Sequence, residues 1–275
     1  MSTLNFIVPL VTVSGIALAA GQAPGQSLVS TGQSFLTAAL LPGAMAGGER
    51  LAGLEMVIVP GWKTYWRSPG EAGVPPRFDW SASGNLAEVE VLWPRPEMFE
   101  SFGMMTIGYG GRVVLPIRLV PEDPDAPIEV ALALEVGVCA DICVFENTVL
   151  EAVYAPELES HTDAIAAAHE MVPPSGLEAG VLRAECRIEG AGRERAFSAL
   201  LELADPPVNP YVVIEGTDEA WFHDVEVAQQ GAHLAVRAGL ALPTAEQWIT
   251  RKDVRMTVFA MSGASDIRGC APMQG

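Results

Sequence analysis

Short apolar or alternating runs, bounded by glycine, proline or asparagine, recur along most of this chain and constrain its fold more than any other feature. Before about Pro156 the runs are SFLTAALLP, LAGLEMVIVP, AEVEVLWP, GRVVLPIRLVP, IEVALALEV and NTVLEAVYAP. Alternation of apolar and polar residues is typical of strands with one buried face, and runs of this spacing suit an antiparallel β-sandwich. Several runs end in proline, which has no amide hydrogen to give to a neighbouring strand. The pattern predicts a mainly β fold.

A different pattern follows this first half. The Ala-rich segment from about His161 to Met171 has Thr162 as a candidate N-cap and Pro173-Pro174 as a stop, so it predicts one short helix. Strand-like runs then resume as GVLRAECRIEG, AFSALLELA, NPYVVIEG, DVEVAQQG, HLAVRAGLAL and DVRMTVFAMSG. A chain of 275 residues is long enough for two domains. We expect two β-sandwich domains at 28–156 and 175–272, joined by a helical linker at 160–174.

The first 20 residues predict export. They read MSTLNFIVPLVTVSGIALAA, a short apolar stretch that ends in Ala17-Leu18-Ala19 and fits the small-x-small pattern of a secretory cleavage site. We interpret 1–20 as a signal peptide. Because no Lys or Arg precedes the apolar run, an uncleaved N-terminal membrane anchor stays open, although the run is at the short limit for spanning a bilayer. Export favours an oxidising compartment in which four cysteines can pair.

Charge and motif content exclude several functions. The formal net charge is −18, and the first charged side chain is Glu49, so the acidity survives removal of a signal peptide. Nucleic acid is therefore not expected as a partner, since binding phosphates needs a basic face. No Ser-His-Asp, P-loop or dinucleotide pattern is present, and the four histidines have no metal-ligand spacing. We predict no cofactor and no metal.

The cysteines carry the clearest chemistry. Cys139 and Cys143 are separated by Ala-Asp-Ile at the end of the run IEVALALEVGV. A three-residue spacer can form a hairpin turn that brings the flanking Cβ atoms within disulfide reach, which fits both thiol–disulfide chemistry and a structural staple. Cys186 and Cys270 lie far away in sequence. We expect these two to form a structural disulfide between an early strand of the second domain and its C-terminal end.

A longer set of motifs resembles a known family. The segments are PGWKTYWRSPGEAGVPPRFDW, VEVLWPRPEMFESFGMMTIGYGGRVVLPIRL and LEVGVCADICVFENTVLEA. In this order they resemble the periplasmic N-terminal domain of the thiol:disulfide interchange protein DsbD, nearest to the form in DsbD- and ScsB-like proteins linked to copper tolerance and cytochrome c maturation. The resemblance covers about Ser34 to Ala155.

The resemblance implies an immunoglobulin-like sandwich that acts as a protein-disulfide reductase-type module in the periplasm. Cys139 and Cys143 would be its redox pair, taking electrons from a membrane-embedded electron transporter and passing them to periplasmic thioredoxin-like proteins. Position in the motif favours Cys143 as the cysteine that forms the intermolecular bond. Exchange needs little more than two sulfurs and an access path, because a thiolate attacks a disulfide sulfur directly.

Four further residues are candidates around the pair. In the family a loop bearing an aromatic residue covers the cysteines, and the segment FESFGMM lies at the matching place. Phe102 is therefore the candidate cap, with Phe99 as its alternative. Either ring also fits core packing. The family also places aromatic residues near the pair from the strand that contains Tyr65, although that strand is mostly core. Asp141 would raise the thiol pKa by like-charge repulsion, or it is an ordinary turn residue.

The chain departs from the family in two ways. Its cysteine spacer is shorter than in the best-known DsbD sequences, and it ends without the eight-helix membrane domain and the thioredoxin-like domain of the full architecture. We therefore expect a stand-alone module whose electrons come from a separately encoded membrane protein. The half after about Ser175 resembles the second β domain of ScsB-like relatives only loosely, and no activity is predicted for it.

Two other functions stay open. One is a non-enzymatic immunoglobulin-like binding or chaperone module with structural disulfides. The other is a Cu(I)-binding protein that uses the soft sulfurs of Met98, Met104, Met105 and the cysteines. The chain contains no Met-rich repeat to support the copper site.

Overall fold

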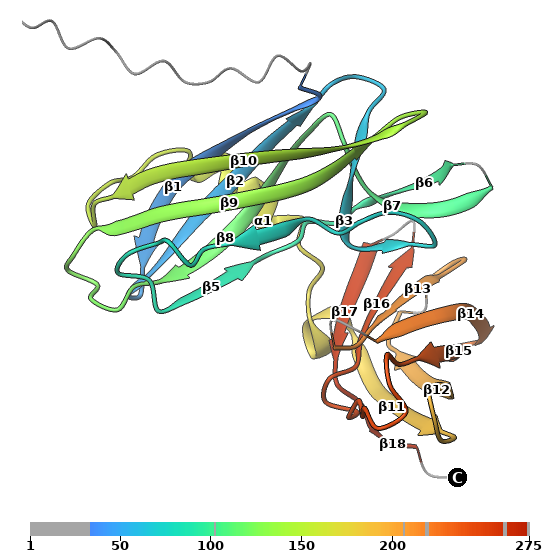
Figure 1. The fold of residues 1–275 in the computed structure, drawn as a ribbon. Coiled ribbons are helices and arrows are strands. Elements are labelled where there is room, and N and C mark those ends of the chain that lie inside the picture. The colour runs from blue at the N-terminus through green and yellow to red at the C-terminus, as the bar shows by residue number, and fades with distance from the viewer. Residues whose placement is uncertain (1–33, 102, 206, 218–219, 261–262, 274–275) are drawn as a thin grey trace, which may run out of the picture. The chain divides into compact units, whose positions relative to one another are not determined.

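The computed structural model describes residues 34–101, 103–205, 207–217, 220–260 and 263–273, which form four β-sheets, one α-helix and one short 3₁₀ helix (Figure 1). The predicted signal peptide at 1–20 lies outside the described residues. Strands dominate both halves of the described chain, which confirms the predicted mainly β fold.

The first two sheets share one core. One sheet has the order β1-β2-β8-β5, with β1 at Leu36–Ala46, β2 at Glu49–Ile58, β8 at Arg112–Val120 and β5 at Glu88–Val91. The other has the order β10-β9-β3-β7-β6, with β10 at Cys143–Tyr154, β9 at Ile128–Cys139, β3 at Lys63–Gly70, β7 at Met104–Gly110 and β6 at Glu97–Ser101; β4 at Arg77–Asp79 also pairs with β9. The pairings within both sheets are antiparallel, as in immunoglobulin-like sandwiches.

Alternation along β9 determines which side chains enter this core. Its even-numbered residues from Ile128 to Val138 are buried in the same cluster as residues of β2 and β8. Successive side chains of a strand point to opposite faces, so the odd-numbered residues, including Cys139, lie on the outer face of the sheet. On the adjacent strand β3, Trp66 belongs to the core, and Tyr65 therefore faces the same outer side as Cys139.

The predicted helix is α1, Thr162–Glu170. Its Ile165 packs with Leu41 and Val114, so the helix covers part of the β1-β2-β8-β5 sheet as well as connecting the two halves. The expected N-cap was wrong: Thr162 is the first helical residue, and His161 precedes it in a left-handed conformation without a side-chain cap bond. Contacts with the sheet, rather than a cap, hold this helix end.

The second half forms two further sheets around its own core. The larger has the order β14-β15-β12-β11-β18, with β14 at Trp221–Gln230, β15 at His233–Ala241, β12 at Glu194–Leu203, β11 at Val181–Glu189 and β18 at Ala271–Pro272. The smaller has the order β13-β16-β17, with β13 at Tyr211–Glu215, β16 at Arg255–Ala260 and β17 at Gly263–Arg268. A 3₁₀ helix, η1 at Gly176–Ala179, precedes β11. This half is a second β-sandwich.

Apolar contacts cross the expected domain boundary. Val213 of β13 and Phe259 of β16 belong to the core cluster of the first two sheets, and the ring of Phe259 meets Trp66 edge-on at 5.4 Å between centroids. Ser34–Gly275 accordingly forms one compact unit. The division at 28–156, 160–174 and 175–272 stays a prediction.

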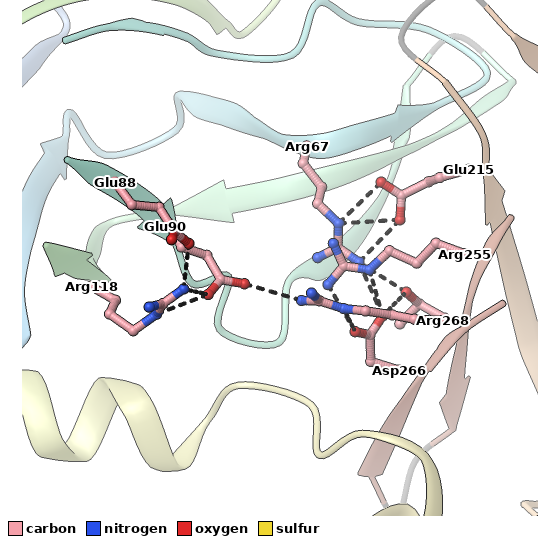
Figure 2. A network of polar contacts seen from close by, with 9 residues as sticks. Arg67, Glu88, Glu90, Arg118, Glu215, Arg255, Asp266 and Arg268 are labelled. Carbon is pink, nitrogen blue, oxygen red and sulfur yellow. Dashed lines mark hydrogen bonds and ion pairs between the residues drawn. The ribbon is translucent and has the colours of Figure 1, made fainter. Parts of the chain in front are cut away.

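A polar network crosses the same boundary (Figure 2). Arg67 of β3 lies 3.8 Å from the Trp66 ring centre and donates to both Glu215 oxygens at 3.0 and 3.1 Å. Asp266 accepts from Arg255 at 2.7 and 2.8 Å. Burial alone would raise the pKa of Asp266, but Arg255 and Arg67 hold that pKa below its usual value. The network therefore ties β3, two positions from Tyr65, to β13 of the second half.

Candidate functional site

The cysteine pair closes the tip of the β9–β10 hairpin. Cys139 ends β9, Cys143 begins β10, and the two are direct cross-strand partners joined by a disulfide with a Cα–Cα distance of 4.1 Å. The turn between them is Ala140, Asp141 and Ile142, and the Ala140 amide donates to the Ile142 carbonyl at 2.9 Å. Because β9 and β10 pair along their whole length, both sulfurs are positioned by a regular ladder. The hairpin geometry predicted from the spacing is confirmed.

The two sulfur-bearing residues differ in exposure. Cys139 is 3% exposed, whereas Cys143 is exposed to solvent. The difference follows from position, because β9 lies between β10 and β3 while β10 is the last strand of its sheet. Cys143 is thus the more accessible of the two cysteines, and its role as the attacked residue stays a prediction. Attack there makes Cys139 the leaving thiolate.

Tyr65 supplies the closest polar group. Its hydroxyl donates to Cys139 Sγ at 3.0 Å and lies 3.8 Å from Cys143 Sγ. Burial raises the pKa of the Tyr65 hydroxyl, so this group stays a hydrogen-bond donor at neutral pH. A donor that faces a sulfur stabilises negative charge on it. The arrangement thus favours a thiolate on Cys139 when the disulfide opens.

Two glycines form the slot that holds the Tyr65 ring. A Cβ atom on Gly73 would lie 2.5 Å from Tyr65 Cε1, and one on Gly137 would lie 3.6 Å from Cδ2 and Cε2. Gly73 also has φ at 128°, a conformation that side-chain-bearing residues rarely adopt. The chain after β3 therefore passes close over the Tyr65 ring. Gly73 was not a sequence candidate, because its contact depends on a loop path that no local pattern encodes.

Comparisons with known proteins match the part of the chain that carries this cysteine pair. Residues 30–155 match the family model described as thiol:disulfide interchange protein DsbD, N-terminal. The matched range contains the Cys139–Cys143 pair and Tyr65. Over 87% of its length the chain is also similar to the crystal structure of the N-terminal periplasmic domain of ScsB from Proteus mirabilis, of which it covers 92%, with a TM-score of 0.64 and 22% sequence identity. At that identity the likeness shows the fold. A search of curated proteins gave no match.

The two candidate cap residues, Phe102 and Phe99, come from the segment FESFGMM. Phe102 lies outside the described residues; on either side of it, Phe99–Ser101 end β6 and Met104–Met105 begin β7, and these two strands pair. Phe99 of β6 is partly buried, with its ring centre 5.0 Å from Lys63 Nζ. Lys63 is in turn the cross-strand partner of Cys139. Whether either phenylalanine shields the sulfurs stays a prediction.

The remaining candidates are Asp141 and the methionines, and their roles stay predictions. Asp141 is exposed at the tip of the hairpin, and its influence on the thiols stays a prediction. Met98 and Met104 are exposed on the β6–β7 hairpin. Among the described residues, no group of three or more His, Cys, Asp or Glu side chains is arranged to hold a metal ion.

The second disulfide joins Cys186 and Cys270, as expected. Their Cα atoms are 5.6 Å apart; Cys186 lies in β11, and Cys270 directly precedes β18, which pairs in parallel with β11. Cys186 is 1% exposed, so the cross-link is partly embedded in the second core. This burial contrasts with the exposed Cys143 and fits a structural role.

No helix in the described ranges is long and apolar enough to cross a membrane.

Proposed function

We propose that this chain is a periplasmic thiol–disulfide exchange module whose Cys139–Cys143 pair opens and closes as it relays electrons. The observation that carries the proposal is the asymmetry of the pair: one sulfur is exposed and the other is buried beneath a tyrosine hydroxyl. A structural staple has no need for an exposed sulfur or for a donor placed on its buried one.

The reaction follows from this geometry. A thiolate of a reduced partner attacks Cys143 Sγ; the bond between Cys143 and Cys139 breaks, and Cys139 leaves as a thiolate that accepts the Tyr65 hydrogen bond. The partner is now joined to Cys143 by a mixed disulfide. A second thiolate of the partner attacks its own bridged sulfur and releases Cys143, so that two electrons have moved to this chain. Delivery of electrons runs through the same steps in reverse.

Burial of Cys139 has a second consequence. In the reduced protein the buried sulfur is sheltered from solvent oxidants, whereas Cys143 stays available to a docked protein. The Cys139 thiolate then attacks the Cys143 sulfur of the mixed disulfide; the Cys139–Cys143 bond re-forms and the partner leaves as a thiolate. The pair therefore contains an outer cysteine that meets partners and an inner cysteine that resolves the bond.

The partners follow from the family. We infer that a membrane-embedded thiol electron transporter supplies the electrons and that periplasmic thioredoxin-like proteins receive them. Disulfide reduction for cytochrome c maturation or for copper tolerance would be the use of this flow. The DsbD N-terminal match and the likeness to a periplasmic domain of ScsB support this placement, as does the predicted signal peptide.

The proposal is tested by incubating the oxidised protein with reduced thioredoxin, then quenching with acid and alkylating the free thiols. Mass spectrometry should find the new thiols on Cys139 and Cys143, while Cys186 and Cys270 stay joined. Thiols on neither pair would favour a binding or chaperone module with structural disulfides and would refute the exchange function.

A further inference from the structure

The outer face of β10 carries an exposed apolar row that leads away from the redox pair. Phe145, Val149 and Val153 of β10 are 57, 67 and 64% exposed, and Ile142 of the preceding turn is 64% exposed; we call these four residues the β10 row. Phe145, Val149 and Val153 have the same odd numbering as Cys143, so they share its face of the strand. Exposed apolar residues grouped in this way mark interaction sites.

The pattern of β10 is unusual for a strand at the edge of a sheet. Val144, Leu150 and Ala152 pack against the core on its inner face, and its outer face also carries Phe145, Val149 and Val153, which alternate with the polar Asn147 and Glu151. Edge strands normally carry charged side chains toward solvent, whereas strands covered on both faces read as apolar on both. Three large apolar side chains on the solvent side of β10 therefore depart from the usual composition of an uncovered edge strand.

Neighbouring strands do not provide this cover. The cross-strand partners of Phe145 and Val149 are Gly137 and Ala133, which are too small to shield them. Phe145 is also two residues from Cys143 on the same face. A protein that brings its own sulfur to Cys143 has to lie over Phe145, so the row is continuous with the exchange site.

The charges beside the row indicate what covers it. Asp141, Glu129 and Glu151 are all exposed next to the row. Glu129 lies on β9 directly opposite Val153, and Glu151 lies on the outer face of β10 between Val149 and Val153. A second copy of this chain would bring the same carboxylates together, and an anionic membrane surface would be repelled as well. An apolar patch surrounded by basic residues is the complementary surface.

We propose that the β10 row is the docking surface for the thioredoxin-type protein that exchanges electrons at Cys143, which meets the row with an apolar patch around its own reactive cysteine and with basic residues at the rim. This inference rests on the proposed function. It assigns partner recognition to β10 and leaves the sulfur chemistry to the hairpin tip.

The test compares a protein and a small reductant. The rate of reduction of Cys139–Cys143 is measured for the wild type and for a Phe145→Ser, Val149→Ser double variant, once with reduced thioredoxin and once with dithiothreitol, which needs no docking surface. The double variant should react with thioredoxin about tenfold more slowly or worse, as expected when central interface contacts are lost, and should react with dithiothreitol at the wild-type rate. A Val57→Ser, Val59→Ser variant, altered at two other exposed valines, should match the wild type in both assays.

Other outcomes separate this inference from the proposed function. Equal thioredoxin rates for the double variant and the wild type would refute docking on the row while leaving exchange intact. An equal loss of the reduction rate with dithiothreitol would mean that the row acts on the reactivity of the sulfurs, which would refute the inference. A wild-type dimer that the substitutions abolish would assign the row to a second copy of this chain, which would refute it as well. A wild type inert to both reductants would overturn the proposed function itself.

Discussion

A Cys143→Ser variant should lose thiol–disulfide exchange completely, whereas a Cys139→Ser variant should still attack and then stop as a stable mixed disulfide. The reason is the exposure of the two residues: Cys143 is open to solvent, and Cys139 is 3% exposed beneath Tyr65. Without Cys143 no accessible sulfur remains in the pair. Without Cys139 the mixed disulfide forms but has no inner thiolate to resolve it.

Non-reducing electrophoresis and intact-mass measurement after mixing each variant with an oxidised thioredoxin-type protein check this result. The Cys139→Ser protein should accumulate a species of the summed mass, which a reductant dissociates. Accumulation by Cys143→Ser instead would reverse the assignment of the outer and inner cysteines, and it would contradict the order of attack inferred from burial.

Removal of the second disulfide by Cys186→Ser with Cys270→Ser should have the largest effect on stability. The two cysteines are 84 residues apart, and closing a loop of that length in the unfolded chain corresponds to about 4–5 kcal/mol in the chain-entropy relation. Urea unfolding should show this loss, and the reactivity of Cys139–Cys143 toward dithiothreitol should be unchanged.

The matched control is the variant that lacks the Cys139–Cys143 bond. That bond joins residues only four positions apart, so the same relation gives about 2 kcal/mol for it. A smaller loss from the long loop than from the short one would disagree with the structural role of Cys186–Cys270.

Local patterns in the sequence predicted the strands and the cysteine hairpin well. β9 is one example: its alternation is strict because one face packs in the core, and its pairing with β10 follows from a three-residue turn. The prediction that Cys139 and Cys143 meet needed only this register. Tyr65 was identified from the family resemblance, but its hydroxyl contact with Cys139 required the side-by-side placement of β3 and β9.

Features that depend on long-range placement were missed or were wrong. FESFGMM was expected to lie in a loop, whereas its ends belong to the short strands β6 and β7; β7 pairs with both β6 and β3, so these strands depend on partners that are distant in sequence. The slot around Tyr65 depends on Gly73, whose contact arises from the loop path. The different burial of the two cysteines depends on which strand ends the sheet, and strand order is not encoded locally.

Redox titration of the folded protein in glutathione buffers tests the central claim most directly. Samples equilibrated from the oxidised and from the reduced side are quenched by alkylation, and the thiols at each cysteine are counted while circular dichroism monitors the fold. We predict one reversible two-electron transition at Cys139 and Cys143, with the same midpoint from both directions, an intact fold, and Cys186–Cys270 closed throughout. A Cys139–Cys143 bond that stays closed until the protein unfolds would contradict the account.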